Sequence, residues 1–543
     1  MGKIDGNFEG KNQSMNGQPG FAFRMLHRAC GIAVAVSIAV VPSTATADED
    51  APAGIRAAFA APFSTHAVLQ RGCPLPVWGS AAPGSDVSVT LDSMTESVKA
   101  DADGCWKVVF PAQDKPGLGH RLLLSVDGAV ADELDDIAIG DVWLCSGQSN
   151  MEMSYDWIIT RGKEDIEKAD DLAMRLLHVW NAASPVPLSQ PVLPITWTPA
   201  DFANSRKFSA CGWFFGQTLR KAMPDIPIGL IDATWNGSPI QTWLSDTAFR
   251  SAGADCAADS RKFRSQCGES DAAEYVRQLD EWRAAGSHGE PPKAPETTHR
   301  SPSACFNAML HPLFPLAVKG AVWYQGCNDV GNPGRYARVF RALAADWRTR
   351  FTHPDGLPIY IVQLAAFMKT HDSPLDSAWA RMRWTQMRLG ESIEKSGTAV
   401  AIDVGDHRDI HPKDKKTVGE RLARLALART YGLAGVVEAG PIPQAATLGG
   451  GAVSVTFKNT AGLSTSDGGT VSGFQLVAAD GQTVWADATI SGDLVSVTVP
   501  ENFAPVKVRF AWDDYPDCNL VNGDNLPCGP FEFPISDGAE TLR

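Results

Sequence analysis

The chain has 543 residues and a formal net charge of −14, from 48 lysines and arginines against 62 aspartates and glutamates. A chain of this length is too long for one compact core, and about 150 residues per domain predicts roughly two to four domains. Lysine and arginine are scattered singly, so the sequence lacks the basic patch that nucleic acid requires, and we expect a neutral or polar ligand.

The N-terminal segment has the order of a secretory signal. Arg24 and Arg28 precede the apolar run 29–41, and small residues at 45–47 supply a cleavage site. The apolar run has about 13 residues where a membrane span needs about 20, so a cleaved signal peptide at 1–47 is preferred to a membrane anchor. We therefore expect a periplasmic or secreted protein with no membrane contact after cleavage.

Cysteine usage agrees with export. Of 11 cysteines one lies in the signal, which leaves an even number for an oxidising compartment. Cys256 with Cys267 and Cys518 with Cys528 are close in sequence within polar segments, so these are the expected disulfides. Cys145 lies in an apolar run and is expected to be a free thiol in the core.

Residues 56–135 read as short strands separated by turns. Apolar and polar residues alternate on both sides of the turn at Asp103 and Gly104. This pattern predicts an N-terminal β-sandwich-like domain. Trp78 and Trp106 within it could stack on a sugar ring, although core packing is the simpler role for both.

Residues 137–436 change pattern, because continuous apolar runs alternate with longer helix-like segments. This alternation predicts an α/β domain with a mainly parallel sheet, whose ligands bind beyond the carboxyl ends of the strands. The charged segment 247–303 within it reads as a surface insertion or lid. Residues 437–543 return to β patterning, so all-β segments are expected at both ends of the α/β domain.

Ser149 lies where a buried strand meets a polar turn. Residues 141–155, DVWLCSGQSNMEMSY, pass from an apolar run into a cluster of serine, glycine, glutamine and asparagine. A serine at such a place can be a turn former, a helix N-cap or a nucleophile. Which of these three roles Ser149 has depends on the chemical groups that follow the other predicted strands.

His411 is the candidate for the base that a serine nucleophile needs. It follows the strand-like run 398–404 and precedes Pro412 and an amphipathic helix. A histidine in such a loop can reach a serine that is far away in sequence.

Two further strand ends supply amide groups. Gly237 lies in a turn after the run 228–233, and Gln325, Gly326 and Asn328 follow the run 320–323. Backbone N–H groups and side-chain amides of this kind bind an oxyanion. With a candidate nucleophile and base, the four strand ends predict hydrolysis of an ester.

Two rival interpretations remain open at this point. The β segments and the 16 tryptophans could hold a glycan in a binding protein whose α/β part is a degenerate esterase. A peptidase or lipase is the other, but the serine lies in Ser-Gly-Gln-Ser-Asn and not in the G-x-S-x-G turn of α/β-hydrolases.

The sequence resembles the sialate O-acetylesterase family of carbohydrate esterases, within the SGNH hydrolase fold. The resemblance is carried by residues 140–151, 306–326 and 410–423, with support from 65–79 and 519–533. It implies a three-layer SGNH-type domain and a secreted or periplasmic enzyme that removes acetyl groups from sugars. Acetylated sialic acid and acetylated plant cell-wall glycan both remain open as the substrate.

Carried over by position, the resemblance makes Ser149 the nucleophile and His411 the base. Many SGNH enzymes have an aspartate three residues before the histidine, but that position here is Arg408. Asp409 is therefore assigned to orient the histidine, either by its carboxylate or by its main-chain carbonyl, with Asp406 or Asp403 as the next acids to test.

The oxyanion donors implied by the resemblance are the N–H groups of Ser149 and Gly237 and a third group. Relatives usually read Gly-Glu-Ser-Asn where this chain reads Gly-Cys-Asn-Asp, so Gln325 and Asn328 both remain candidates for the third donor. No metal site and no phosphate-binding loop is apparent in the sequence, and no cofactor is expected.

Overall fold

The computed structural model describes residues 56–157 and 161–536. The predicted signal peptide at 1–47 lies outside this range. Within it, no helix is both long enough and apolar enough to span a membrane.

The N-terminal β segment contributes two groups of strands. One is a three-stranded sheet of β1 (Ala58–Phe59), β3 (Leu75–Ser80) and β6 (Cys105–Phe110). In the other, β4 (Asp86–Leu91) pairs with β5 (Met94–Lys99) and β7 (Gly117–Val126), while β2 (Val68–Gln70) pairs separately with residues 138–140. Strand β6 alternates exposed and buried residues, so Trp106 and Phe110 point into the core, as a strand with one buried face requires.

Strand β8 (Ala129–Gly147) joins this segment to the centre of the molecule. Its first half pairs with β7 in antiparallel fashion, and Asp141–Gly147 pairs with β11 in parallel. The boundary expected between residues 135 and 137 therefore falls inside one continuous strand, and the N-terminal segment shares that strand with the central sheet.

The central sheet has the strand order β10-β9-β11-β8-β12-β13-β14. Its strands are β9 (Asp170–His178), β10 (Trp197–Asp201), β11 (Ile228–Thr234), β12 (Gly320–Tyr324), β13 (Ile359–Val362) and β14 (Ser396–Ala399). All neighbours from β9 to β14 are parallel, but β10 is antiparallel to β9. Together with the antiparallel pairs that β8 brings from the N-terminal segment, this makes an 11-stranded mixed sheet, which corrects the expectation of a mainly parallel one. Short turns join β4 to β5 and β7 to β8, whereas β9 and β10 are joined by the longer segment 179–196, and the parallel strands need crossovers.

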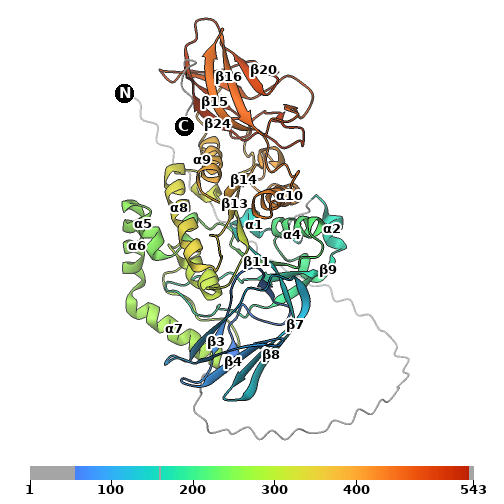
Figure 1. The fold of residues 1–543 in the computed structure, drawn as a ribbon. Helices are drawn as coiled ribbons and strands as arrows, with labels where there is room; N and C mark the ends of the chain where they lie inside the picture. The colour runs from blue at the N-terminus through green and yellow to red at the C-terminus, as the bar shows by residue number, and fades with distance from the viewer. Residues whose placement is uncertain (1–55, 158–160, 537–543) are drawn as a thin grey trace, which may run out of the picture. The chain divides into compact units, whose positions relative to one another are not determined.

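Helices cover both faces of the parallel strands. Figure 1 shows α8 (Pro333–Arg350) and α9 (Ala378–Ser392) on one side and α4 (Ala210–Ala222) and α10 (Lys415–Leu425) on the other. The strands are therefore buried on both faces, which explains their continuous apolar runs. The arrangement is a three-layer α/β structure.

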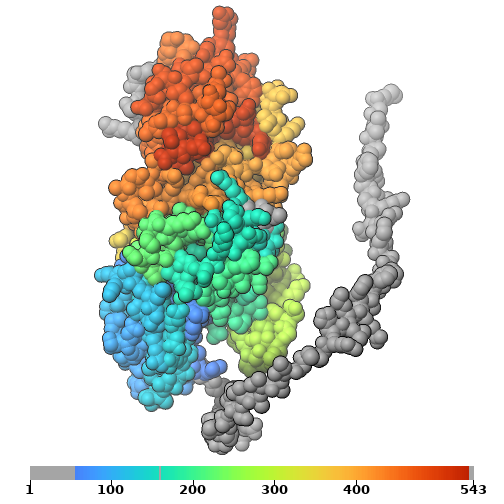
Figure 2. Space-filling view, turned by 90° about the vertical axis from the view of Figure 1, so that its right-hand side faces the viewer, coloured from blue at the N-terminus to red at the C-terminus, as the bar shows by residue number. Residues whose placement is uncertain are grey.

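Helices α4 and α10 pack closely against each other, and Figure 2 shows the orange segment that contains α10 lying directly on the green segment that contains α4. A Cβ atom at Gly419 would lie 2.7 Å from the Cys211 carbonyl oxygen, so only glycine allows this approach. Asp414 caps α10 by accepting from the Thr417 N–H. Helix α10 is thereby fixed directly after His411.

The remaining helices are short or peripheral. They are α1 (Ser149–Glu152), α2 (Lys163–Glu167), α3 (Phe202–Ser205), α5 (Asp246–Ser251), α6 (Ala254–Cys267) and α7 (Glu269–Ala284), with single turns at Ile240–Thr242, Phe306–Leu310, His311–Leu313, Cys327–Asp329, Ile402–Val404 and Ala426–Thr430. The segment expected to be an insertion or lid thus contains α5, α6 and α7, and α5 packs on α8.

The C-terminal segment is all β. One four-stranded sheet contains β15 (Ile442–Gly449), β16 (Ala452–Lys458), β20 (Ala488–Ser491) and β21 (Leu494–Thr498), and a second contains β18 (Phe474–Ala478), β19 (Thr483–Trp485), β22 (Pro505–Phe510) and β24 (Phe531–Pro534). The pair β17 (Ser464–Thr465) and β23 (Leu520–Val521) lies beside them. Phe474, Phe510 and Phe531 form the centre of its own core. The extra β segment predicted at this end is present.

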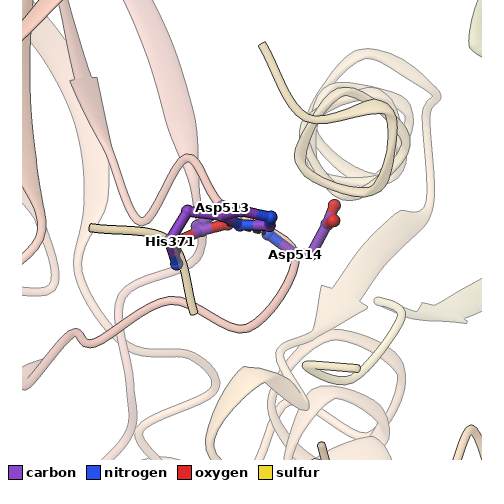
Figure 3. A group of neighbouring side chains, drawn as sticks. All are labelled: His371, Asp513 and Asp514. Atoms are coloured by element: carbon purple, nitrogen blue, oxygen red, sulfur yellow. Dashed lines mark hydrogen bonds and ion pairs between the residues drawn. The ribbon is translucent and has the colours of Figure 1, made fainter. Parts of the chain in front are cut away.

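Hydrogen bonds of buried and partly buried polar groups connect the C-terminal segment with the α/β layers. The buried Arg383 guanidinium donates to the main-chain oxygens of Asp513 and Asp514 at 2.8 and 2.6 Å. His371 donates its main-chain N–H to one Asp513 oxygen, and its Nδ1 lies 2.7 Å from the other. Figure 3 shows the Asp514 carboxylate turned away from these two side chains, and it accepts from Ser377 at 2.6 Å.

Residues His371, Asp513 and Asp514 bring three potential metal ligands within 4.8 Å of one another, a grouping that the sequence did not reveal. Both Asp513 oxygens and one Asp514 oxygen already accept protein hydrogen bonds. These hydrogen bonds explain why the three side chains lie together: they connect the C-terminal segment with the α/β layers.

The ten cysteines of the described residues are all unpaired. The expected bridge between Cys256 and Cys267 is wrong, because both residues lie in α6 and its rise of about 1.5 Å per residue puts them about 16 Å apart, beyond the reach of a disulfide. Cys518 and Cys528 are likewise free thiols, and burial raises the pKa of Cys518 to about 12. Cys145 is buried and free, as expected.

Candidate active site

Ser149 follows the end of β8 at a turn that only glycine permits. Gly147 has φ +140, and a Cβ atom there would lie 2.3 Å from the Tyr324 carbonyl oxygen. The Gln148 N–H donates to the same oxygen at 3.1 Å, which fixes the turn against β12. Ser149 then opens the four-residue helix α1 at the carboxyl edge of the sheet.

His411 meets Ser149 from the loop before α10. Its Nε2 lies 3.0 Å from the Ser149 hydroxyl oxygen, although 262 residues separate them in the chain. Its Nδ1 lies 3.2 Å from Asp409 Oδ1. With a proton on Nδ1 directed at Asp409, Nε2 has a lone pair for the serine proton. This arrangement allows the Ser149 hydroxyl to pass its proton to the imidazole.

The Asp409 carboxylate has a second contact in the same loop. Its Oδ1 accepts the main-chain N–H of His411 at 2.9 Å. The side chain is 45% exposed, so solvent reaches the carboxylate. Asp409 therefore approaches the histidine through its carboxylate. This carboxylate is more exposed to solvent than the buried aspartate of a Ser-His-Asp triad.

The other two acids considered from the sequence do not contact the imidazole in the described structure. Asp403 forms a two-point ion pair with Arg421 at 2.6 and 2.7 Å. Asp406 accepts the Arg408 N–H at 2.8 Å and belongs to a local turn.

The His411 imidazole lies between opposite charges. Burial lowers its pKa, the Asp409 carboxylate acts against this, and the Lys415 ammonium lowers the pKa further, with a net fall below the ordinary value. A lowered pKa keeps the imidazole neutral near neutral pH, and only the neutral form can accept a proton from serine.

Lys415 and Asn150 connect the turn that carries Ser149 with the loop that carries His411. The fully buried Lys415 ammonium donates to Asn150 Oδ1 at 2.6 Å, and Asn150 Nδ2 donates to the Ile410 carbonyl at 3.1 Å. The ammonium also lies 5.3 Å from the centre of the Tyr324 ring. Burial lowers the pKa of Lys415 to about 8. These bonds hold Ser149 and His411 in register across two distant parts of the chain.

Gly237 lies in a loop beside the serine turn. The Trp235 N–H donates to the Gly147 carbonyl at 3.1 Å, which places the loop against the end of β8. Gly237 has φ +71, a conformation that favours glycine. In the described part of the chain, no protein acceptor takes the N–H of Ser149 or of Gly237, so both can serve a ligand.

Gln325 and Asn328 differ in their freedom to bind. Gln325 is fully buried, and its amide donates to Ser238 at 3.2 Å and to Asp329 at 2.6 Å, which uses both hydrogens. Asn328 is exposed, and its Oδ1 lies 3.4 Å from Arg300 Nη1. Of the two candidates, the geometry leaves the Asn328 amide hydrogens available.

Sequence reasoning missed the residues that hold these loops. Arg300 also donates to the Gly237 carbonyl at 3.1 Å and so bridges the loops of Gly237 and Asn328. Gln148 Oε1 accepts the N–H groups of Gly326 and Asn328 at 3.2 and 3.4 Å. Gln148 and Asn150 flank the serine and could have been singled out by position, whereas no sequence pattern marks Arg300.

Comparison with known proteins agrees with an esterase. A family model described as "Carbohydrate esterase, sialic acid-specific acetylesterase" matches residues 302–428. The sialate O-acetylesterases of Mus musculus and Homo sapiens are each 28% identical, covering 89% and 92% of this chain and 95% and 96% of theirs. A crystal structure of a carbohydrate acetylesterase from Xanthomonas citri is 32% identical, with a TM-score of 0.74 over 89% of this chain and 99% of that one.

The fold and these relatives define the class of protein: it is a carboxylic-ester hydrolase that acts on carbohydrate esters. Within that class, the chain belongs to the sialate O-acetylesterase family of carbohydrate esterases. The rival interpretation as a glycan-binding protein with a degenerate esterase domain is not favoured by any of these relatives.

Proposed function

We propose that this protein is exported and removes acetyl groups from acetylated sugars through an acyl-enzyme on Ser149. The observation that carries the proposal is the 3.0 Å contact between His411 Nε2 and the Ser149 hydroxyl. The predicted signal peptide supports a periplasmic or secreted location.

The first half of the reaction transfers the acetyl group to the enzyme. His411 Nε2 takes the proton of Ser149 as its oxygen attacks the acetyl carbonyl, which gives a tetrahedral oxyanion. The oxyanion collapses, the bond to the sugar oxygen breaks, and the imidazolium gives its proton to the departing sugar hydroxyl. In the second half, His411 takes a proton from water as the water oxygen attacks the acetyl-serine. The bond between the acetyl carbon and the Ser149 oxygen then breaks, the imidazolium returns its proton to that oxygen, and acetic acid leaves.

Three donors are assigned to the oxyanion. They are the N–H groups of Ser149 and Gly237 and the side-chain amide of Asn328. Gln325 is assigned a supporting role, because its amide hydrogens are already bonded to Ser238 and Asp329. Donors fixed before the reaction stabilise the developing charge without reorganisation.

Asp409 is assigned to hold the imidazole through its carboxylate, 3.2 Å from Nδ1. The same atom accepts the His411 main-chain N–H, so the loop itself sets the orientation of the ring. We assign the chemistry to residues 137–436 and accessory roles to the β segments 56–135 and 437–543. Acetylated sialic acid and acetylated plant cell-wall glycan are the two substrates to compare.

Replacement of Ser149 by alanine tests the mechanism. Ser149→Ala removes only the attacking oxygen, so acetate release should be abolished while the melting temperature stays close to that of the wild type. Activity near the wild-type level in this variant would refute the assignment of Ser149.

A further inference from the structure

Two tryptophans follow neighbouring strands beside the nucleophile. Trp180 comes two residues after the end of β9, and Trp235 comes directly after β11, the strand that lies between β9 and β8. Parallel strands about 4.8 Å apart bring their carboxyl ends to the same edge of the sheet. Both tryptophans therefore follow strands that end at the edge from which Ser149 emerges.

Trp180 presents an exposed but fixed aromatic surface. It is 51% exposed, which is unusual for so large an apolar side chain. Its indole N–H donates to the Pro194 carbonyl at 3.2 Å, and its ring meets the His178 ring with centroids 4.6 Å apart at 80°. Two contacts thus hold the indole in place while one face remains open to solvent.

His178 supplies a polar group beside this surface. Its Nδ1 lies 3.1 Å from Asp232 Oδ2, and the ring is one-third exposed. No described residue bonds to its Nε2. Burial acts to lower the pKa of His178, but Asp232 and Glu152 outweigh it and raise the pKa above its ordinary value.

Direct contacts connect this cluster with the nucleophile helix. His178 pairs with Asp232 in the sheet, and Asp232 pairs with Cys145 of β8, so the end of β9 lies about 10 Å from Cys145, two residues before the end of β8. Asn181 donates to Glu152 of helix α1 at 2.9 Å. The loop that carries Trp180 is therefore bonded to the helix that begins with Ser149.

Trp235 lies in the same loop as Gly237, directly after β11. Its ring stacks on His299 with centroids 5.0 Å apart at 26°. Its main-chain N–H is bonded to Gly147, and Gly237 follows two residues later. A group bound against Trp180 and Trp235 would therefore adjoin the oxyanion donors.

From these positions we propose a sugar-binding subsite next to Ser149, formed by the rings of Trp180 and Trp235 with His178 Nε2 as a polar partner. Its ligand is the pyranose ring that carries the acetyl group. Such a ring has an apolar C–H face suited to an indole and hydroxyl groups suited to an imidazole nitrogen. The subsite rests on the proposed function, because it positions the ester that Ser149 attacks.

Trp180→Ala tests the subsite when two kinds of ester are compared. The sugar esters are an O-acetylated xylo-oligosaccharide and O-acetylated N-acetylneuraminic acid, and p-nitrophenyl acetate is the ester without a sugar. For the sugar ester that the wild type cleaves, kcat/KM should fall about 10-fold, the effect of losing about 1.4 kcal/mol of contact. For p-nitrophenyl acetate it should stay within about two-fold, and Trp180→Phe should restore part of the loss.

Trp485→Ala is the matched control. Trp485 is 40% exposed and also donates its indole N–H to a main-chain oxygen, that of Asp372 at 3.0 Å, but it lies in β19 of the C-terminal segment. This variant should cleave both esters as the wild type does. Equal values of kcat/KM for wild type and Trp180→Ala on the sugar ester, or equal losses on both esters, would overturn the subsite.

A binding measurement separates the subsite from the chemistry. Calorimetric titration of Ser149→Ala with the two acetylated sugars should give binding that the double variant Ser149→Ala, Trp180→Ala loses by about 10-fold. If the wild type cleaved neither sugar ester, the proposed function would fail and this titration alone would decide the subsite. Equal affinity in the two variants, or no binding in either, would overturn it.

Discussion

The Asp409→Asn variant separates two ways of orienting His411, the proposed base. In the structure Asp409 Oδ1 serves both the His411 main-chain N–H at 2.9 Å and the ring nitrogen Nδ1 at 3.2 Å. Asparagine keeps an oxygen that can accept both hydrogens, so the substitution removes the negative charge and little else. The variant therefore measures what the charge contributes.

The exposure of the carboxylate sets the size of the effect. A buried triad aspartate changed to asparagine can cost about 10⁴-fold in turnover. Asp409 is 45% exposed, and exposed ion pairs contribute about 0.2–1 kcal/mol, whereas hydrogen bonds to charged groups contribute about 1.5–3 kcal/mol. We take the contribution of the Asp409 charge to lie between these limits, at about 1–2 kcal/mol. Its loss then lowers kcat/KM by about 5- to 30-fold.

The pH profile of Asp409→Asn gives a second test, the direction in which the pKa of His411 moves. Asp409 acts to raise the pKa of His411, so loss of its charge should lower that pKa and move the acid limb of kcat/KM to lower pH. Hydrolysis of p-nitrophenyl acetate across pH measures both quantities, with Asp406→Asn as the control that should behave as the wild type. A loss of kcat/KM near 10⁴-fold would show that Asp409 acts as the buried acid of a Ser-His-Asp triad. An unchanged kcat/KM and pH profile would show that the main-chain carbonyl orients the ring.

Two further variants probe the groups around the dyad. Lys415→Met keeps the length of the side chain but removes the cation that lowers the His411 pKa, so the acid limb of kcat/KM should move to higher pH, opposite to Asp409→Asn; an unmoved limb would contradict this. Asn328→Ala should lower kcat by about 10²-fold with little change in melting temperature, because one oxyanion donor is lost from an exposed position. If Gln325 supplied the third donor instead, Asn328→Ala would keep the wild-type kcat.

Much of the architecture could be predicted from the sequence, because the burial of a strand determines the pattern of its apolar residues. Continuous apolar runs at β8, β11 and β12 mark strands covered on both faces, and alternation at β6 marks a strand with one buried face. The extent of β8 could not be read in the same way. A strand that leaves one sheet environment and enters another has no turn signal at the change, so the boundary near residue 136 was placed inside it.

The candidate site was predictable only where chemistry and local pattern coincide. Ser149 and His411 each follow a strand and each carry a reactive group, so their approach to 3.0 Å follows from the carboxyl edge of one sheet. The choice between Gln325 and Asn328 depends on which amide is already bonded, and that depends on Ser238 and Asp329 from two different loops. The missed disulfide geometry has a similar origin, because Cys256 and Cys267 look close in sequence but helix α6 separates them.

The chain that follows the helical segment of residues 246–284 contacts the candidate site. That chain returns to the carboxyl edge with His299 stacked on Trp235 and Arg300 bonded to Gly237 and close to Asn328. Arg300 thereby links the loop after β11 with the loop after β12, the two loops that flank the serine turn. A cation at this point also favours negative charge between the loops, where the oxyanion would form. Residues 299 and 300 therefore connect the segment predicted as an insertion directly to the loops of Gly237 and Asn328, the proposed oxyanion donors.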